Sequence, residues 1–321
     1  MFVLKKTAFE PWELTARHKA MYQLGYTPIS SYFPYITDDD GLNPVLMDLN
    51  TGNKDISDLE RIAKNKGYDI SSVTDNNPFF YKFEKGIPQS VSLVLWASII
   101  ILLLVILVPP LYWMKASHKA KANLRSQKDF NQNSIRFALL FMMLGVGFMT
   151  IEISLIQRFI LFLGQPVLSI AVLLFSLLIG TGTGSLVSGR LALSKIISGI
   201  TIVCLSIAAT LLIYAFLFPL VFNQLLGTDF AIRLLVTVII MFPLGFLMGF
   251  PFPLGIRLLK IMKMENYIPW LWGINGVSSV LGSTMTVAIA ISFGFTQALL
   301  VGAGCYFIVF LVFQKGKAMI S

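Results

Sequence analysis

The sequence carries little charge for its length. Only 13% of its 321 residues are Asp, Glu, Lys or Arg, whereas a soluble domain carries about 25%. Hydrophobic residues make up 56% of the chain, and they gather in runs long enough to cross a bilayer. This composition excludes an ordinary soluble globular protein and predicts a polytopic membrane protein.

Cysteine and histidine are scarce, with two residues of each in the chain. Cys204 and Cys305 lie inside apolar runs, so each is expected to be a small buried side chain rather than half of a disulfide. His18 and His118 are too few and too poorly placed for catalysis or for metal or haem ligation. We therefore expect no catalytic or metal site.

Seven apolar runs are expected to span the membrane as an all-α bundle over residues 89–321. They cover residues 90–113, 135–162, 166–188, 196–222, 231–255, 270–293 and 296–313. Gly294 leaves room only for a tight turn between the last two runs. Those two helices should therefore be antiparallel neighbours.

The net charge of +9 does not indicate nucleic-acid binding, because the basic residues cluster beside the apolar runs. The loop after the first run is the most basic, and Lys and Arg also mark every second loop after it. Cytoplasmic loops of membrane proteins carry this excess of Lys and Arg. The alternation predicts a cytoplasmic C-terminus, and it places residues 1–88 outside.

Residues 1–88 hold most of the acidic residues and no run long enough to span. A helix is expected from Pro11, and a second over residues 56–66, with Asp55 as N-cap and Gly67 as a left-handed stop. The YFPYI and YDISSV runs are candidate short strands. The sequence therefore predicts a small α/β domain here that resembles the C-terminal part of a larger α/β domain.

Two ionisable residues stand inside the second apolar run. A charge at the centre of a spanning helix costs roughly 2.5–3.5 kcal/mol on insertion scales. At about 100° per residue, Glu152 points away from the face that holds Gln157 and Arg158, so pairing of Glu152 with Arg158 along one helix is not expected. Either Glu152 binds a proton, a cation or a polycationic substrate, or it makes a structural ion pair or hydrogen bond to a neighbouring helix while Arg158 reaches the interface.

Small residues mark two further helices. The LLIGTGTGSLVSGR run is not a phosphate-binding loop, because such a loop follows a β-strand and this one ends a membrane helix. In PWLWGINGVSSVLGS, Asn275 is expected to hydrogen-bond to a neighbouring helix. Five glycines are expected to let helices approach closely: Gly180, Gly184, Gly189, Gly276 and Gly282.

SSVTDNNPFFYKFEKG resembles the T-D-D-R-P-F-F-Y stretch that closes the catalytic domain of membrane-embedded spermidine-synthase-like proteins. In that family a polyamine aminopropyltransferase-like Rossmann domain is fused to hydrophobic helices. EISLIQRFILFLG, GSLVSGR, FPFPLGIR and PWLWGINGVSSVLGS look like the helices that follow that domain. This chain departs from the family at Asn76 and Asn77, where the family usually has Asp and Arg.

The family's glycine-rich cofactor loop and catalytic acidic residues have no counterpart in residues 1–88. The resemblance implies the C-terminal portion of such a protein, which alone binds no cofactor and transfers no aminopropyl group. We expect an anchor or accessory half in the bacterial inner (plasma) membrane, with the lipid bilayer and an upstream spermidine-synthase-like fragment as partners. The alternative is a transporter-like bundle for polyamines or other cations that uses Glu152.

The charge pattern and the resemblance conflict over residues 1–88. The charges place this segment outside, whereas an enzyme that uses a nucleoside cofactor needs the cytoplasm. A re-entrant segment at 135–162 would resolve the conflict and would also spare Glu152 and Arg158 a full crossing. It would, however, break the charge alternation downstream.

Overall fold

The chain forms two compact units. The computed structural model describes residues 10–24, 48–49, 51–65, 67–68, 70, 73–79, 86–117 and 124–314. The first unit comprises Met1–Ser72 with Phe80–Lys85, and the second comprises Val73–Phe79 with Gly86–Ser321. The short stretch Val73–Phe79 thus clusters with the membrane helices and not with the residues on either side of it.

The first unit contains the two helices expected from the sequence, α1 (Pro11–Gln23) and α3 (Ile56–Asn65). At the start of α3 the main-chain N–H of Asp55 donates to Asp58 Oδ2 at 3.2 Å, as in a capping box. After the helix, Gly67 has a φ of +85°. This left-handed conformation ends the helix and favours glycine.

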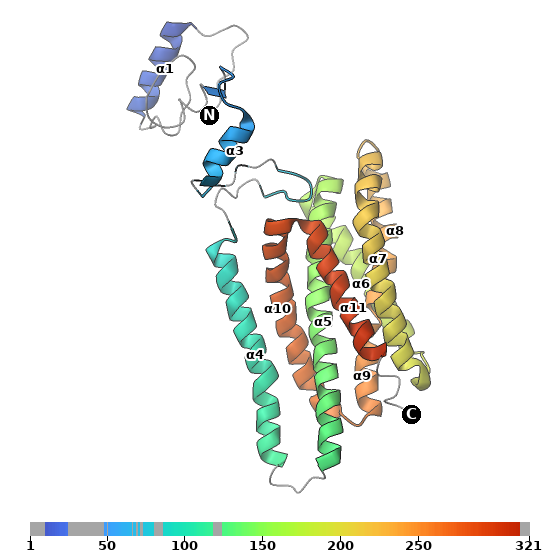
Figure 1. Cartoon of the computed structure of the whole chain (residues 1–321). Helices are drawn as coiled ribbons and strands as arrows, with labels where there is room; N and C mark the ends of the chain where they lie inside the picture. The colour runs from blue at the N-terminus through green and yellow to red at the C-terminus, as the bar shows by residue number, and fades with distance from the viewer. Residues whose placement is uncertain are drawn as a thin grey trace. The chain divides into compact units, whose positions relative to one another are not determined.

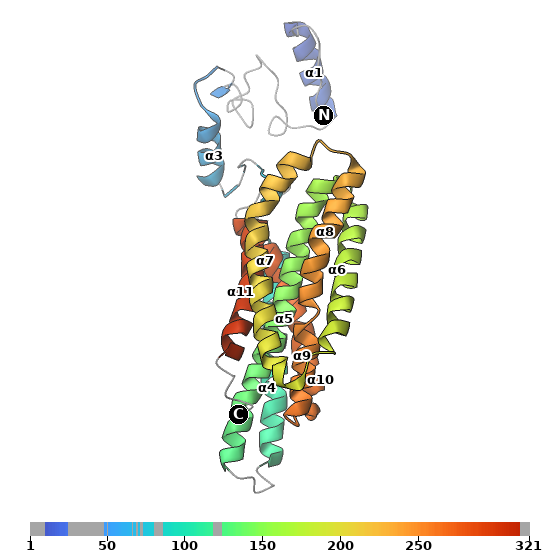
Figure 2. The ribbon, with the colours of Figure 1, turned by 90° about the vertical axis from the view of Figure 1, so that its right-hand side faces the viewer.

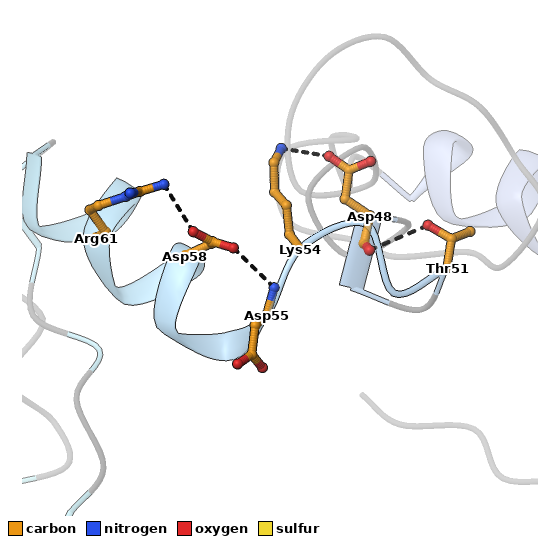
Figure 3. Close-up of polar contacts among 6 residues, drawn as sticks. All are labelled: Asp48, Thr51, Lys54, Asp55, Asp58 and Arg61. Carbon is orange, nitrogen blue, oxygen red and sulfur yellow. Dashed lines mark hydrogen bonds and ion pairs between the residues drawn. The ribbon is translucent and has the colours of Figure 1, made fainter.

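Short-range polar contacts order the chain before and along α3 (Figure 3). Lys54 Nζ lies 2.5 Å from Asp48 Oδ2, and Arg61 Nη2 lies 2.9 Å from Asp58 Oδ1. Thr51 Oγ1 donates to the main-chain oxygen of Asp48 at 3.3 Å. Both ion pairs are solvent-accessible, so each adds little to stability.

The expected α/β character of residues 1–88 is not shown. The described residues contain no β-strand, and within YDISSV the described positions Tyr68, Ile70 and Val73 are not in one. YFPYI lies outside the described residues. Near this region the structure has an isolated bridge between Thr74 and Asn77, which closes a tight turn.

The second unit confirms the prediction of a polytopic membrane protein, with seven helical segments long and apolar enough to cross a bilayer (Figures 1 and 2). Its helices are α4 (Gln89–Ser117), α5 (Leu124–Leu163), α6 (Pro166–Ser188), α7 (Ile196–Leu225), α8 (Phe230–Met248), α9 (Pro251–Ile261), α10 (Ile268–Phe293) and α11 (Phe295–Gln314). α8 and α9 belong to one apolar segment, broken before Pro251. Proline opens the second helix because it has no N–H to donate.

α5 lies in the middle of this unit and packs against α6, α8, α9, α10 and α11 (Figure 1). It is one unbroken helix of 40 residues, so segment 135–162 is not re-entrant. Gly294, with a φ of +96°, makes the tight turn into α11. α10 and α11 are antiparallel neighbours, as expected (Figure 1). The core is apolar, and Cys204 and Cys305 are buried free thiols within it, as predicted.

Glycines of α6 and α8 let these two helices approach until their backbones touch. A Cβ added to Gly180 would lie 2.7 Å from the oxygen of Phe242, and one added to Gly245 would lie 2.7 Å from the oxygen of Leu177. A Cβ added to Gly184 would likewise overlap the main-chain oxygen of Phe246. This is the small-residue packing that membrane helices use in place of hydrophobic burial.

The other expected glycines differ among themselves. Gly282 lies at a close approach to α5, where an added Cβ would meet the oxygen of Val146 at 2.7 Å. A Cβ on Gly276 would meet nothing within 4 Å, and one on Gly189 would meet only Leu186 of its own helix. Gly276 and Gly189 are therefore not at close helix contacts.

We predict that Gly180→Ala destabilises the second unit and that Gly182→Ala does not. Overpacking against a backbone that cannot yield costs about 1–3 kcal/mol, whereas an added Cβ at Gly182 meets nothing within 4 Å. Thermal unfolding of both variants in the same detergent checks this. Equal unfolding temperatures would contradict the packing described for α6 and α8.

Candidate functional site

Arg158 is a buried cation near the end of α5, and only 7% of it is exposed. Its Nη2 donates to Asn76 Oδ1 at 3.4 Å and to Thr296 Oγ1. Its Cζ lies 5.9 Å from the centroid of the Phe218 ring, a cation–π contact. Its Nε–H has no partner in the described part of the chain. Neutral oxygens and an aromatic face thus hold this charge.

Asn76 supplies most of the acceptors at this point. Its Oδ1 also accepts from the Thr296 main-chain N–H at 2.8 Å and from Thr296 Oγ1 at 2.7 Å. Its main-chain oxygen accepts from the N–H of Phe295 at 2.9 Å. Because α11 begins at Phe295, Asn76 satisfies two N–H groups that a helix start leaves unpaired. We name Asn76, Arg158 and Thr296 the Asn76 latch.

The sequence around Asn76 explains how it reaches the start of α11. The N–H of Asn77 donates to the oxygen of Thr74 at 2.9 Å, so residues 74–77 form a tight turn. Asp and Asn are favoured in such turns, and Asn76 occupies a central position. Phe79 follows Asn76 by three residues. The centroid of its ring lies 5.6 Å from that of Phe295, which adds an apolar contact beside the latch.

Gly294 is fitted to the latch in two ways. Its φ of +96° is a conformation that favours glycine. A Cβ at this position would also overlap the side-chain amide of Asn76, lying 2.7 Å from its Cγ. The tight turn between α10 and α11 therefore leaves the space that Asn76 fills.

Glu152 lies elsewhere on α5. It follows Gly145 by seven residues, so its side chain leaves the helix about 20° from that of Gly145 and about 10 Å further along. Gly145 packs against Ser278 and Ser279 of α10. Glu152 is half-buried, and no described residue makes a hydrogen bond or ion pair with it. The structure does not bring Glu152 and Arg158 together.

Two other polar candidates have different surroundings. Asn275 Nδ2 donates to the oxygen of Phe141 at 2.9 Å, so Asn275 joins α10 to α5, as the sequence suggested. Gln157 is half-buried, and its side chain makes no hydrogen bond within the described ranges. Gln157 therefore does not belong to the latch, although it precedes Arg158.

Two other arginines of the spanning segments bind main-chain carbonyls at helix ends. Arg233 Nη1 donates to the oxygen of Phe162, at the end of α5, at 2.8 Å. Arg257 donates at 2.7 Å to the oxygens of Ser188 and Leu191, at and just after the end of α6. Cations at helix C-termini satisfy unpaired carbonyls and complement the helix dipole. In the sequence analysis Arg257 appeared only within FPFPLGIR, with no bonding role expected for it, and Arg233 was not singled out.

The latch itself was missed from the sequence. Asn76 stood out only as a departure from a family motif, and Thr296 gave no signal of its own. A polar residue two positions after Gly294, at the start of an apolar run, was the one available hint of a helix start in need of a cap. Its partner lies 220 residues away in the chain, so spacing alone could not identify it.

We predict that Asn76→Ala destabilises the second unit by about 1–3 kcal/mol, the usual consequence of leaving buried donors without an acceptor. Asn76→Asp keeps the acceptor and adds a carboxylate beside Arg158 and a helix start, so its stability should equal or exceed that of the wild type. Asn77→Ala is the matched control, since the Asn77 side chain makes no described hydrogen bond. The free energy of unfolding of the three variants, measured with denaturant in detergent, checks this order. Equal losses for Asn76→Ala and Asn77→Ala would contradict the latch.

Family models, curated proteins and solved structures provide no match for this chain. The likeness to spermidine-synthase-like proteins therefore rests on the quoted motifs. The activity that this likeness implies is accordingly a proposal.

Proposed function

We propose that this chain is the integral membrane part of a spermidine-synthase-like protein, serving as a membrane anchor and accessory half that is non-catalytic alone. The latch carries the proposal. Asn76 lies in the TDNNPFFY segment, at a position where the family usually has Asp, and Arg158 lies in EISLIQRFILFLG. The resemblance rests in part on these two segments, and the two side chains meet. The latch gives these motif residues a physical reason to occur together.

The latch also gives the accessory role a structural basis. Val73–Phe79 clusters with the membrane helices, while the residues on both sides of it belong to the first unit. Within the second unit, the stretch before α4 is thus held at Asn76 in addition to its covalent link to α4. A partner that binds this chain would be retained at the membrane.

The proposed location is the bacterial inner membrane, with a cytoplasmic C-terminus. Seven crossings, one for each candidate span among the described residues, would put the residues before α4 and the residues after α11 on opposite sides. Reporter fusions after residues 120 and 318 should both report the cytoplasm. A cytoplasmic signal from the region before α4 would contradict this orientation and would move the first unit to the compartment of the nucleoside cofactor.

Co-purification tests the anchor proposal directly. The full chain, tagged at its C-terminus, is co-expressed with a soluble aminopropyltransferase-like Rossmann domain of the kind the family carries upstream. We expect this domain to purify with solubilised membranes that contain the chain. The chain alone should transfer no aminopropyl group from decarboxylated S-adenosylmethionine to putrescine.

The control for this experiment is the same Rossmann domain expressed with residues 73–321, which keep Val73–Phe79 and the latch and lack Met1–Ser72 of the first unit. We expect that pair not to co-purify. If the full chain and the Rossmann domain never co-purify, the accessory role is wrong. Aminopropyl transfer by the chain alone would overturn the non-catalytic assignment.

A second function is favoured by one observation. A single spanning helix is enough to anchor a protein essentially irreversibly, so seven helices exceed what anchoring requires. Glu152 adds a carboxyl inside a spanning helix with no partner among the described residues. We propose as the alternative a transporter-like bundle in which polyamines or other cations pass Glu152.

A further inference from the structure

Among the described residues, Glu152 is the only acidic residue in the interior of a candidate spanning segment, away from its ends. The other acidic residues after residue 89 are Asp129, Asp229 and Glu265. Asp129 precedes the second spanning segment, Asp229 directly precedes α8, and Glu265 begins the segment that leads into α10. Any cation that a side chain of the membrane core binds through a carboxylate must therefore bind through Glu152.

No cationic side chain of the neighbouring helices faces Glu152. Arg158, on the same helix, leaves α5 about 120° away and is held in the Asn76 latch. Of the helices that pack on α5, α6 and α10 contain no ionisable residue. Arg233 of α8 and Arg257 of α9 bind carbonyls at helix ends. Lys260 lies in the last turn of α9 and is exposed.

The remaining titratable groups next to α5 belong to α11. Cys305 and Tyr306 pack against Gly147, which leaves α5 about 140° away from Glu152. Glu152 thus has neither a cationic partner nor an ionisable neighbour on the elements packed against its helix. Burying an unpaired negative charge is costly, and uptake of a proton removes that cost by converting the carboxylate into the neutral acid.

The adjacent surface of α10 is polar. Ser278 and Ser279 pack against Gly145, two turns before Glu152 on the same side of α5. Ser278 is fully buried, and its Oγ has no hydrogen-bond partner in the part of the chain that the structure describes. A hydroxyl both donates and accepts, but Ser278 and Ser279 lie about 10 Å before Glu152 along α5. They mark a polar side of the α5–α10 contact and are not partners of the carboxyl.

We infer that Glu152 is a proton-binding site embedded in the membrane. This inference goes beyond the anchor proposal and is independent of it. It also changes which cation the transporter alternative favours, from a polyamine to a proton. A polyamine carries several positive charges, whereas the core supplies one carboxylate. A single proton neutralises that carboxylate completely, whereas a bound polyamine would leave positive charge uncompensated in a low-dielectric site.

Dicyclohexylcarbodiimide, an apolar reagent for carboxylic acids, is the probe. The acid O–H adds across a C=N bond, so that the proton goes to nitrogen and the carboxyl oxygen to carbon, and an acyl shift then gives a stable N-acylurea. An ordinary glutamate in water has a pKa of about 4.3 and is almost fully ionised at neutral pH. Only a carboxyl that retains its proton should react efficiently there.

The full chain in proteoliposomes is treated with the probe at neutral pH, digested and analysed by mass spectrometry. We expect the adduct on Glu152, none on Asp229 or Glu265, and a loss of labelling as the pH is raised. Because Glu152 is half-exposed, the probe can reach it. Absence of the adduct in the folded protein would therefore mean an ionised or paired carboxylate and would overturn the inference.

Two further measurements separate the alternatives. Spermidine present during labelling should not protect Glu152 from the probe. If spermidine protects Glu152 at every pH tested, the site binds a polyamine and not a proton, and the inference is overturned. Glu152→Gln, a neutral isostere of the acid, should unfold at the wild-type temperature and lose the adduct. A clear drop in its unfolding temperature would indicate a structural ion pair and would also overturn the inference. Co-purification with the Rossmann domain should be unchanged in this variant.

Discussion

Burying Arg158 without a carboxylate is the constraint on which much of this structure depends. Arg158 is buried near the end of α5, and a buried charge without hydrogen-bond partners is strongly destabilising. The charge is instead held by Asn76 and Thr296, so the start of α11, the turn at Gly294 and the segment Val73–Phe79 are tied to one guanidinium. A polar stretch of chain thereby becomes part of the membrane unit.

The same solution recurs at several other strong donors in the spanning segments. Arg233 and Arg257 bind carbonyls that helix ends leave free. Trp270 Nε1 donates at 2.7 Å to the oxygen of Val105, whose usual donor four residues later would be Pro109, which has no N–H. Each donor satisfies an acceptor that helix geometry leaves unpaired. No described cation pairs with Glu152, and this is the observation from which the proton site was inferred.

Much of the membrane architecture followed from the sequence, because span length, small-residue spacing and a lone amide are local signals. The seven spans, the close approach at Gly180 and Gly184, and the link from Asn275 to α5 are examples. The latch could not be predicted from the sequence, because Asn76 lies 82 positions before Arg158 and 220 positions before Thr296. The expected close contacts at Gly189 and Gly276 were wrong, because composition cannot show which side of a helix has a neighbour. The expected α/β character of residues 1–88 rested on two short runs, one of which lies outside the described residues.

Double-mutant cycles on Arg158 test the central claim, that charges in the membrane core are satisfied by neutral oxygens and not by one another. Denaturant unfolding is measured for Arg158→Gln alone and combined with Asn76→Ala or with Glu152→Gln. The account predicts a coupling energy of about 1–3 kcal/mol between Arg158 and Asn76. Between Arg158 and Glu152 it predicts additivity within about 0.5 kcal/mol. A large coupling between Arg158 and Glu152, with additivity between Arg158 and Asn76, would contradict it.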